Sequence, residues 1–382
     1  MKIVLSGVET NNKGAELMLY AILQEIERRW PDAEVFIPFY CVRQGLDYLH
    51  TNLNLRYTPF SKLIFKLRIN AILRILHIPY GWLYYVTRVK DADWFLDGSG
   101  YGFSDLWNIK DGRVNAWETM LKDLHQHNCK IVFLPQAFGP VEQENTKRML
   151  RLCNDYASLV IPREQVSYGH IVKSGVLNLD KVKVFTDFTS LVEGVFPRGY
   201  ERLKNGICII PNRQMILKGA TTYDNYFQFL TGIIGKANNS GYPVYLLNHE
   251  GPKDAALALQ CKERIGDGVE VVTGLNALEV KGLISSAYLV VSSRFHGLAS
   301  SLNSCVPCLS TSWSFKYEEL YKDYGISSCV LPINDVSKSM EMFTDYLNEG
   351  TNNAIRMKLR SNHDKVVSQT KEMWNTLWQL GR

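Results

Sequence analysis

The sequence lacks the features that would place it in several simple classes. It has no long uncharged apolar run of the kind that spans a membrane, and residues 1–5 lack the basic start, long apolar core and cleavage site of a secretion signal. It also has no P-loop, dinucleotide fingerprint, short repeat or low-complexity tract. No cluster of His, Asp or Glu has metal-ligand spacing. We therefore expect a cytoplasmic, metal-independent protein that needs no bound cofactor.

The eight cysteines do not form a short-spaced framework and are scattered through strand-like and helix-like segments. Such scattering is typical of reduced thiols in a cytoplasmic core. Cys305 and Cys308 are the one close pair. They follow a helical pattern and lead into a strand, which favours two packed thiols over a redox or metal site.

The composition is that of a globular protein. With 382 residues, 46% hydrophobic and 21% charged, the chain is long enough for two domains and too apolar for a disordered or fibrous protein. The net charge of +5 comes from 43 basic and 38 acidic residues, so it does not predict nucleic-acid binding.

Strand-like and helix-like segments alternate along the whole chain, which predicts an α/β fold with mostly parallel sheets. A loop-like stretch after Asp187 suggests a boundary between an N-terminal domain, 1–195, and a C-terminal domain, 196–382, both Rossmann-like and facing a cleft. Residues 352–380 read as one long helix, which we interpret as able to cross back onto the first domain. The expected strands are 1–8, 34–38, 94–96, 130–134, 159–162, 182–185, 206–210, 243–247, 270–272, 288–291 and 308–310.

Residues 61–90 depart from this alternation, because closely spaced apolar residues are interrupted by lysines and arginines with no acidic residue among them. This pattern predicts a basic amphipathic helix lying on an anionic membrane surface, and the alternative is a core helix with a solvated basic face. Tyr80, Trp82, Tyr84 and Tyr85 favour the membrane interface.

Residues able to bind an anion follow the strand expected at 288–291. Ligands bind at the carboxyl ends of strands in open α/β sheets, and there the sequence places Arg294 and His296, with Lys316 after the next strand. The imidazole is suited to proton transfer near neutrality. Asn12 and Lys13 lie between a strand and a helix, where free N–H groups favour an anion or a sugar hydroxyl.

Six segments together resemble the polysaccharide pyruvyl transferase family over most of the chain. Arg294-Phe295-His296-Gly297 and Ser312-Trp313-Ser314-Phe315-Lys316-Tyr317 are the most specific. The resemblance implies a GT-B-like fold, and transfer of pyruvate from phosphoenolpyruvate to two hydroxyls of a sugar as a cyclic ketal, with phosphate release. The other four segments are 11–16, 97–100, 134–140 and 161–164.

The resemblance also implies roles for individual residues. His296 would be the general acid/base, and Asp97 or Asp105 would orient or deprotonate the sugar hydroxyl; a loop cap is the alternative for Asp105. Lys316 would neutralise the leaving phosphate, or else be a surface lysine beside Trp313. Independently of the resemblance, Asn248-His249-Glu250 ends a predicted strand and would line the donor pocket or cap a turn. The substrate-binding candidates are Arg163, Arg294, Lys316, Asn12, Lys13, Ser293, Gln136 and Asn248.

Two other functions remain open at this point. In a sugar-nucleotide-dependent glycosyltransferase of the same fold, Arg294 and Lys316 would bind diphosphate and Glu318 or Glu319 a ribose. A non-catalytic saccharide-binding protein is the second alternative, but it would not need the pair of Arg294 and His296. The basic segment 61–90 suggests a lipid-linked surface-polysaccharide intermediate as acceptor, and peripheral contact with the inner face of the cytoplasmic membrane.

Overall fold

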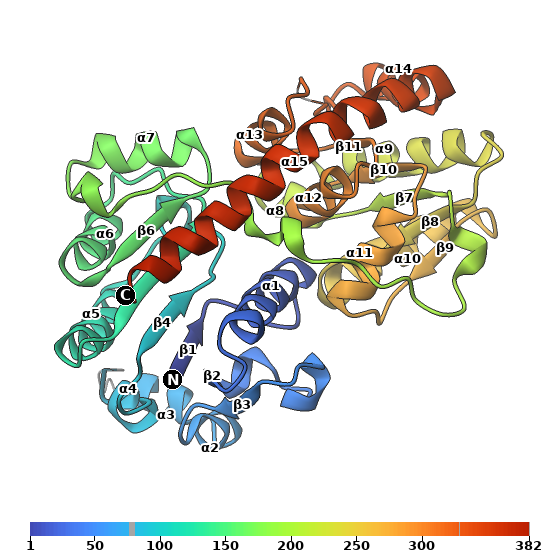
Figure 1. Cartoon of the computed structure of the whole chain (residues 1–382). Coiled ribbons are helices and arrows are strands. Elements are labelled where there is room, and N and C mark those ends of the chain that lie inside the picture. The colour runs from blue at the N-terminus through green and yellow to red at the C-terminus, as the bar shows by residue number, and fades with distance from the viewer. Residues whose placement is uncertain (76–80, 328, 382) are drawn as a thin grey trace. The chain divides into compact units, whose positions relative to one another are not determined.

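Most of the strands are short and buried along their whole length, as in β4 (Trp94–Asp97) and β10 (Leu289–Ser292). Continuous burial is typical of parallel strands covered by helices on both faces. The computed structural model describes residues 1–75, 81–327 and 329–381 and contains two sheets, in which the pairings between the named strands are parallel. The predicted α/β fold class is confirmed (Figure 1).

The chain divides into two compact units. The first unit comprises Met1–Thr10, Met18–Phe188 and Thr370–Arg382, and the second comprises Asn11–Leu17 and Thr189–Gln369. The division in the middle of the chain thus falls between Phe188 and Thr189. The first turns of one helix, α1 (Lys13–Arg29), are grouped with the second unit.

The sheet of the first unit has the strand order β3-β2-β1-β4-β5-β6, which is the doubly wound Rossmann order. In this order the topological switch point lies between β1 and β4, whose carboxyl ends are Ser6 and Asp97. The remaining strands are β1 (Lys2–Ser6), β2 (Glu34–Ile37), β3 (Asn54–Tyr57), β5 (Lys130–Gln136) and β6 (Leu159–Pro162). The other helices of this unit are α2 (Ser61–Lys66), α3 (Ile69–Ile75), α4 (Gly81–Thr87), α5 (Asp111–Gln126), α6 (Glu144–Tyr156) and α7 (Gln165–Ser174).

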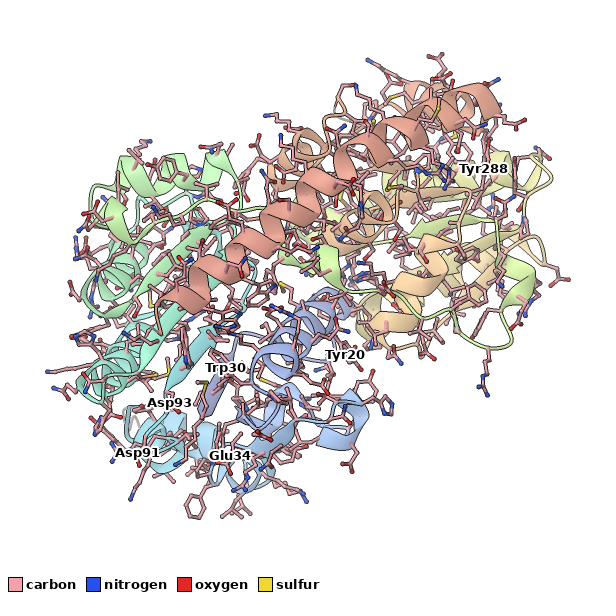
Figure 2. All side chains as sticks on the ribbon, viewed as in Figure 1. Tyr20, Trp30, Glu34, Asp91, Asp93 and Tyr288 are labelled. Atoms are coloured by element: carbon pink, nitrogen blue, oxygen red, sulfur yellow. The ribbon has the colours of Figure 1, made fainter. Side chains whose placement is uncertain are left out.

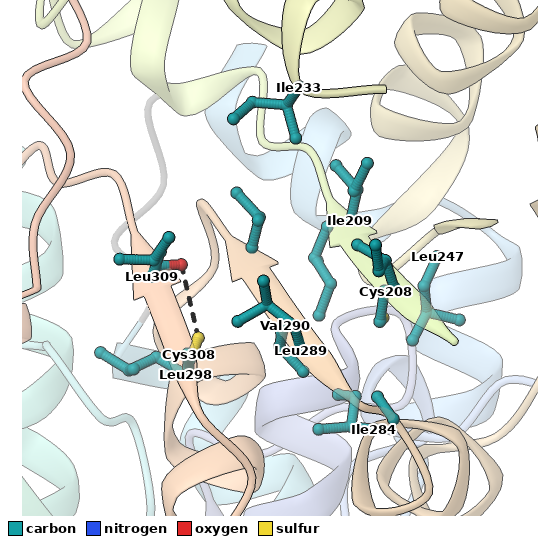
Figure 3. Close-up of a cluster of buried hydrophobic side chains, with 14 of the residues drawn as sticks. Cys208, Ile209, Ile233, Leu247, Ile284, Leu289, Val290, Leu298, Cys308 and Leu309 are labelled. Atoms are coloured by element: carbon teal, nitrogen blue, oxygen red, sulfur yellow. Dashed lines mark hydrogen bonds between the residues drawn. The ribbon is translucent and has the colours of Figure 1, made fainter. Parts of the chain in front are cut away.

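The sheet of the second unit has the order β11-β10-β7-β8-β9, so its switch point lies between β10 and β7. Its core is a cluster of hydrophobic side chains in which Ile209 and Val290 come from these two neighbouring strands (Figure 3). The other strands are β7 (Ile207–Ile210), β8 (Val244–Leu247), β9 (Glu270–Val272) and β11 (Cys308–Ser310). The helices are α8 (Gln214–Leu217), α9 (Tyr223–Asn238), α10 (Gly251–Ile265), α11 (Ala277–Ser285), α12 (Phe295–Asn303), α13 (Lys316–Asp323) and α14 (Val336–Leu347).

The predicted C-terminal helix is present as α15 (Glu349–Gln379), and its residues from Thr370 onward belong to the first unit. There the Trp378 ring meets the rings of Trp30 and Trp94, with centroids 4.6 and 5.3 Å away. Its indole Nε1 donates to Oε1 of the buried Glu25, 2.9 Å away. Figure 2 shows Trp30 at the end of α1. The end of α15 is therefore part of the core of the first unit.

Two local predictions are wrong. Residues 61–90 do not form one amphipathic helix, because α2 ends at Lys66 and Arg68 takes a left-handed conformation with φ of 51° before α3 begins. The expected strand 182–185 is reduced to a single bridge between Val182 and Val160. Tyr80 lies outside the described residues, as does the side chain of Trp82. Over the part of the chain that is described, no helix is long and apolar enough to cross a membrane.

Candidate active site

The turn that follows β10 is held by a buried network centred on Ser293. The Ser293 hydroxyl accepts from the hydroxyls of Tyr226 and Thr311, each 2.7 Å away, and its carbonyl accepts from Asn212 Nδ2 at 2.8 Å and from Tyr317 OH at 2.9 Å. Burial raises the pKa of Tyr226 well above its usual value, so this phenol stays a donor. Ser293 is buried and serves to position the residues after it.

Arg294 is the N-cap of α12, and its guanidinium lies against two carboxylates. Its Nε and Nη2 are 2.8 and 2.5 Å from Oδ2 of Asp254, and Nη1 forms an ion pair with Glu250. Asp254 is buried in the first turn of α10, and its Oδ1 accepts from the backbone N–H of Arg213, 3.0 Å away. The side chain of Glu250 is 33% exposed. The inner carboxylate is thus buried and held by a second contact, whereas the outer one is partly exposed to solvent.

Burial has opposite consequences for the two members of the inner pair. It lowers the pKa of Arg294 to about 10, which leaves the guanidinium charged at neutral pH. Burial raises the pKa of Asp254 to about 7, although the N–H of Arg213 and its nearby charge lower it. Asp254 therefore depends on the guanidinium beside it to remain ionised.

His296 lies in the first turn of α12 and packs on the start of α1. A methyl group on Gly14 would overlap the imidazole ring, so the ring rests directly on the backbone at that position. The close approach of the His296 ring therefore requires glycine at position 14. The rings of Phe295 and His296 are nearly perpendicular, at 87°.

The predicted Asn12 and Lys13 are brought to the same end of the second sheet. Asn12 forms an antiparallel bridge with Glu250, and the backbone N of Lys13 donates to the carbonyl of His249, 3.1 Å away. The Nζ of Lys13 lies 2.6 Å from Oε2 of Glu16, a fully buried carboxylate whose Oε1 also accepts from the N–H of Ala277. These contacts give Lys13 a structural partner within the second unit.

Asn248 and His249 follow β8 and carry buried polar atoms. Among the described residues, Oδ1 of Asn248 and Nδ1 of His249 have no hydrogen-bond partner. Burial lowers the pKa of His249 well below its usual value, and the positive charges of Arg294, His296 and Lys13 lower it further. His249 is therefore a neutral imidazole beside the cations of the site.

Lys316 begins α13 and is held by aromatic rings. Its Nζ lies 4.6 Å from the ring centroid of Trp313, 5.3 Å from that of Phe295 and 5.8 Å from that of Tyr317. These distances are within the range of cation–π attraction, which keeps the charge beside α12. The second unit therefore collects Arg294, His296 and Lys316 at the carboxyl end of β10.

The predicted residues of the first unit lie at the ends of its central strands. Asp97, at the end of β4, is fully buried and accepts from Ser99 Oγ at 3.0 Å and from Nε2 of Gln136 at 3.4 Å. Burial raises the pKa of Asp97, and the Ser99 and Gln136 hydrogen bonds oppose this. Gln136 Oε1 accepts from the N–H of Gly102. Asp97 and Gln136 together hold the glycine-containing loop after β4.

The two other predicted residues of this unit have partners of their own. Arg163 is buried at the end of β6, 3.6 Å from carboxylate oxygens of both Glu164 and Asp187. Asp105 accepts from the backbone N–H groups of Glu142 and Gln143, at 2.7 and 3.2 Å. These contacts correspond to the loop-cap interpretation of Asp105.

Sequence reasoning included Glu250 in the segment that follows β8 but did not select Arg213 or Asp254. Both of these residues follow the carboxyl ends of strands, and strand order, in which β7 lies next to β10, brings them to Arg294. Within the described ranges no group of three or more His, Cys, Asp or Glu residues has the arrangement of a metal site.

Two parallel Rossmann-like sheets define a GT-B-like α/β fold, and solved structures share this fold. HepE of Anabaena, solved with UDP and glucose, is similar with a TM-score of 0.60 and 13% identity, covering 98% of each chain. The UDP-GlcNAc 2-epimerase of Neisseria meningitidis, bound to UDP-GlcNAc, has a TM-score of 0.60 and 11% identity, covering 99% of this chain and 100% of the other. Identities this low show the fold alone.

The sequence gives the narrower assignment. The family model of polysaccharide pyruvyl transferase matches residues 12–314, and the chain belongs to this family. It is therefore an enzyme, a transferase, and the predicted resemblance is confirmed. A comparison with curated proteins finds no match.

Proposed function

We propose that the protein transfers the pyruvyl group of phosphoenolpyruvate to two hydroxyls of a saccharide, forming a cyclic ketal and releasing phosphate. The observation that carries this proposal is the grouping of Arg294, His296 and Lys316 at the carboxyl end of β10. Phosphoenolpyruvate carries a phosphate and a carboxylate, and two fixed cations beside a helix N-terminus suit such a ligand.

The reaction needs one proton donor and one proton acceptor. In our proposal His296 delivers a proton to the methylene carbon, and the carbon bearing the phosphate becomes electrophilic. A sugar hydroxyl attacks this carbon, the bond to the phosphate oxygen breaks, and a second hydroxyl closes the ring. Of the two hydroxyl protons, one restores the imidazolium and the other leaves on phosphate. Arg294 and Lys316 stabilise the charge that develops on the leaving phosphate.

In this mechanism the carboxylate of Glu250 must give up its contact with Arg294 before the donor binds there. It pairs with Nη1 of Arg294, so an incoming anion competes with its carboxylate for the guanidinium. Asp254 stays in place and orients the guanidinium through Nε and Nη2. We propose that Glu250 moves into solvent when the donor binds.

We assign the acceptor to residues of the first unit. Asp97 and Gln136 organise the loop after β4, beside the switch point where a Rossmann-like sheet binds its ligand, and Arg163 follows the edge strand β6. Asp97 and Asp105 both hold loops of this unit, and we propose that one of these two carboxylates orients the sugar hydroxyl. The proposed reaction uses no cofactor and no metal.

We further propose that the acceptor is a lipid-linked intermediate of a capsule or exopolysaccharide, reached at the inner face of the cytoplasmic membrane. Exposed apolar and basic side chains of α2 support peripheral contact with an anionic membrane, among them Leu63 at 51% exposure.

Calorimetric titration with phosphoenolpyruvate and, separately, UDP-sugars tests the donor. We expect saturable phosphoenolpyruvate binding that is lost in Arg294→Ala and weakened in Lys316→Gln. Because Arg294→Ala leaves Asp254 buried without its partner, Lys316→Gln keeps the test valid if the first variant does not fold. Binding of UDP-sugars without phosphoenolpyruvate would instead support a sugar-nucleotide enzyme, since a UDP-sugar is bound in the similar UDP-GlcNAc 2-epimerase of Neisseria meningitidis.

A further inference from the structure

A cavity of about 250 Å³ lies inside the first unit, bounded by β1, β4, α2, α4 and α5. Its lining contains none of the residues assigned to donor binding or proton transfer, although Ser6 in its wall hydrogen-bonds Asp97. Its lining includes Leu5 from β1, Phe95 from β4 and Ile64 from α2. Tyr40 and Phe65 also line it and are 51% and 39% exposed, so the cavity reaches the surface beside α2.

Four polar side chains of the cavity wall are already hydrogen-bonded to other groups of the protein. The hydroxyl of Ser61 donates to the carbonyl of Thr58, 2.7 Å away, and that of Thr87 donates to the carbonyl of Leu83, 3.0 Å away. Tyr84 and Arg88 both bond to Asp123, at 2.9 and 2.8 Å. With these four side chains satisfied and most of the remaining lining apolar, the cavity offers little to water, so its suitable occupant is apolar.

The outer surface of α2 and of the residues next to it carries both apolar and basic side chains. Phe60, Leu63 and Leu67 are 62%, 51% and 57% exposed, and the exposed cations Lys62 and Lys66 lie between them. No acidic residue occurs from 61 to 90 in the sequence. An apolar surface with cations and no acidic residues is complementary to an anionic amphiphile.

We propose that this cavity binds one hydrocarbon chain of an anionic lipid, with the headgroup at Lys62 and Lys66. Since a water molecule occupies about 30 Å³ of liquid and a methylene group is of similar size, the cavity holds a segment of about eight methylene groups. The inference rests on the membrane contact proposed above, because it identifies the lipid component that α2 and α4 would bind.

Calorimetry with decyl phosphate, below its micelle concentration, tests the site. We expect saturable binding to the wild type and at least tenfold weaker binding to Leu83→Trp, because the indole fills the cavity. Met120→Trp fills it from α5 and serves if the first variant does not fold. Tyr85→Trp is the matched control, since Tyr85 lies on the same helix but is 53% exposed and does not line the cavity.

Further experiments distinguish binding of the lipid headgroup from binding of the hydrocarbon chain. Inorganic phosphate should not compete with decyl phosphate. The double variant Lys62→Glu, Lys66→Glu should sediment less with phosphatidylglycerol vesicles than the wild type does, but should bind decanol with unchanged affinity. Wild-type affinity in both filling variants, or absence of saturable decyl phosphate binding, would overturn the proposal. Phosphoenolpyruvate binding should be unchanged in Leu83→Trp, so failure here is distinguishable from failure of the proposed pyruvyl transfer.

Discussion

Replacing Glu250 by glutamine should tighten phosphoenolpyruvate binding. The variant removes the carboxylate that competes for Nη1 of Arg294 while keeping the size of the side chain. A partly exposed ion pair contributes about 0.5–1 kcal/mol, so its loss should raise donor affinity about two- to fivefold. Calorimetric titration at constant pH and salt measures this change directly.

Glu270→Gln is the matched control for this experiment. Glu270 is 28% exposed and pairs with Arg202 in the same unit, but it lies on β9 and has no contact with Arg294 in the described structure. Its substitution should leave donor affinity unchanged. Unchanged or weaker binding in Glu250→Gln would refute the competition and make Glu250 a structural partner of the guanidinium.

Four further predictions follow from the same contacts. Asp254→Asn should weaken donor binding and lower the free energy of unfolding by about 3–5 kcal/mol, since it leaves a buried guanidinium without its fixed partner; denaturant unfolding measures this loss. His296→Gln should reduce phosphate release about 100-fold or more while the dissociation constant of phosphoenolpyruvate changes little, because proton transfer is lost and the anion ligands remain. Trp378→Ala should lower the free energy of unfolding by about 3–5 kcal/mol through loss of ring packing, whereas Trp378→Phe should cost less; urea titration compares them. His249 should make stability fall below about pH 6.5, because its depressed pKa lets the unfolded chain bind a proton that the folded chain excludes; the slope is at most about 1.4 kcal/mol per pH unit and should flatten in His249→Gln.

The sequence predicted the larger elements well because their patterns are local. The apolar periodicity and helix ends of residues 13–29 correspond to α1, and the buried run before Ser292 corresponds to β10. Residues 61–90 were predicted wrongly as one helix, since periodicity does not reveal that Arg68 adopts a positive φ and ends the run. The basic composition of the segment, in contrast, is independent of its exact conformation.

The sequence by itself determined the α/β class, the family and the presence of Arg294, His296 and Lys316 after buried strands, because strand ends and motif spacing are local properties of the chain. Only the tertiary structure decided what surrounds them. Glu250 and Asp254 are 44 and 40 positions from Arg294 in the sequence, and parallel strands joined by helices bring their side chains together. Such contacts depend on strand order across the sheet, which no short pattern encodes.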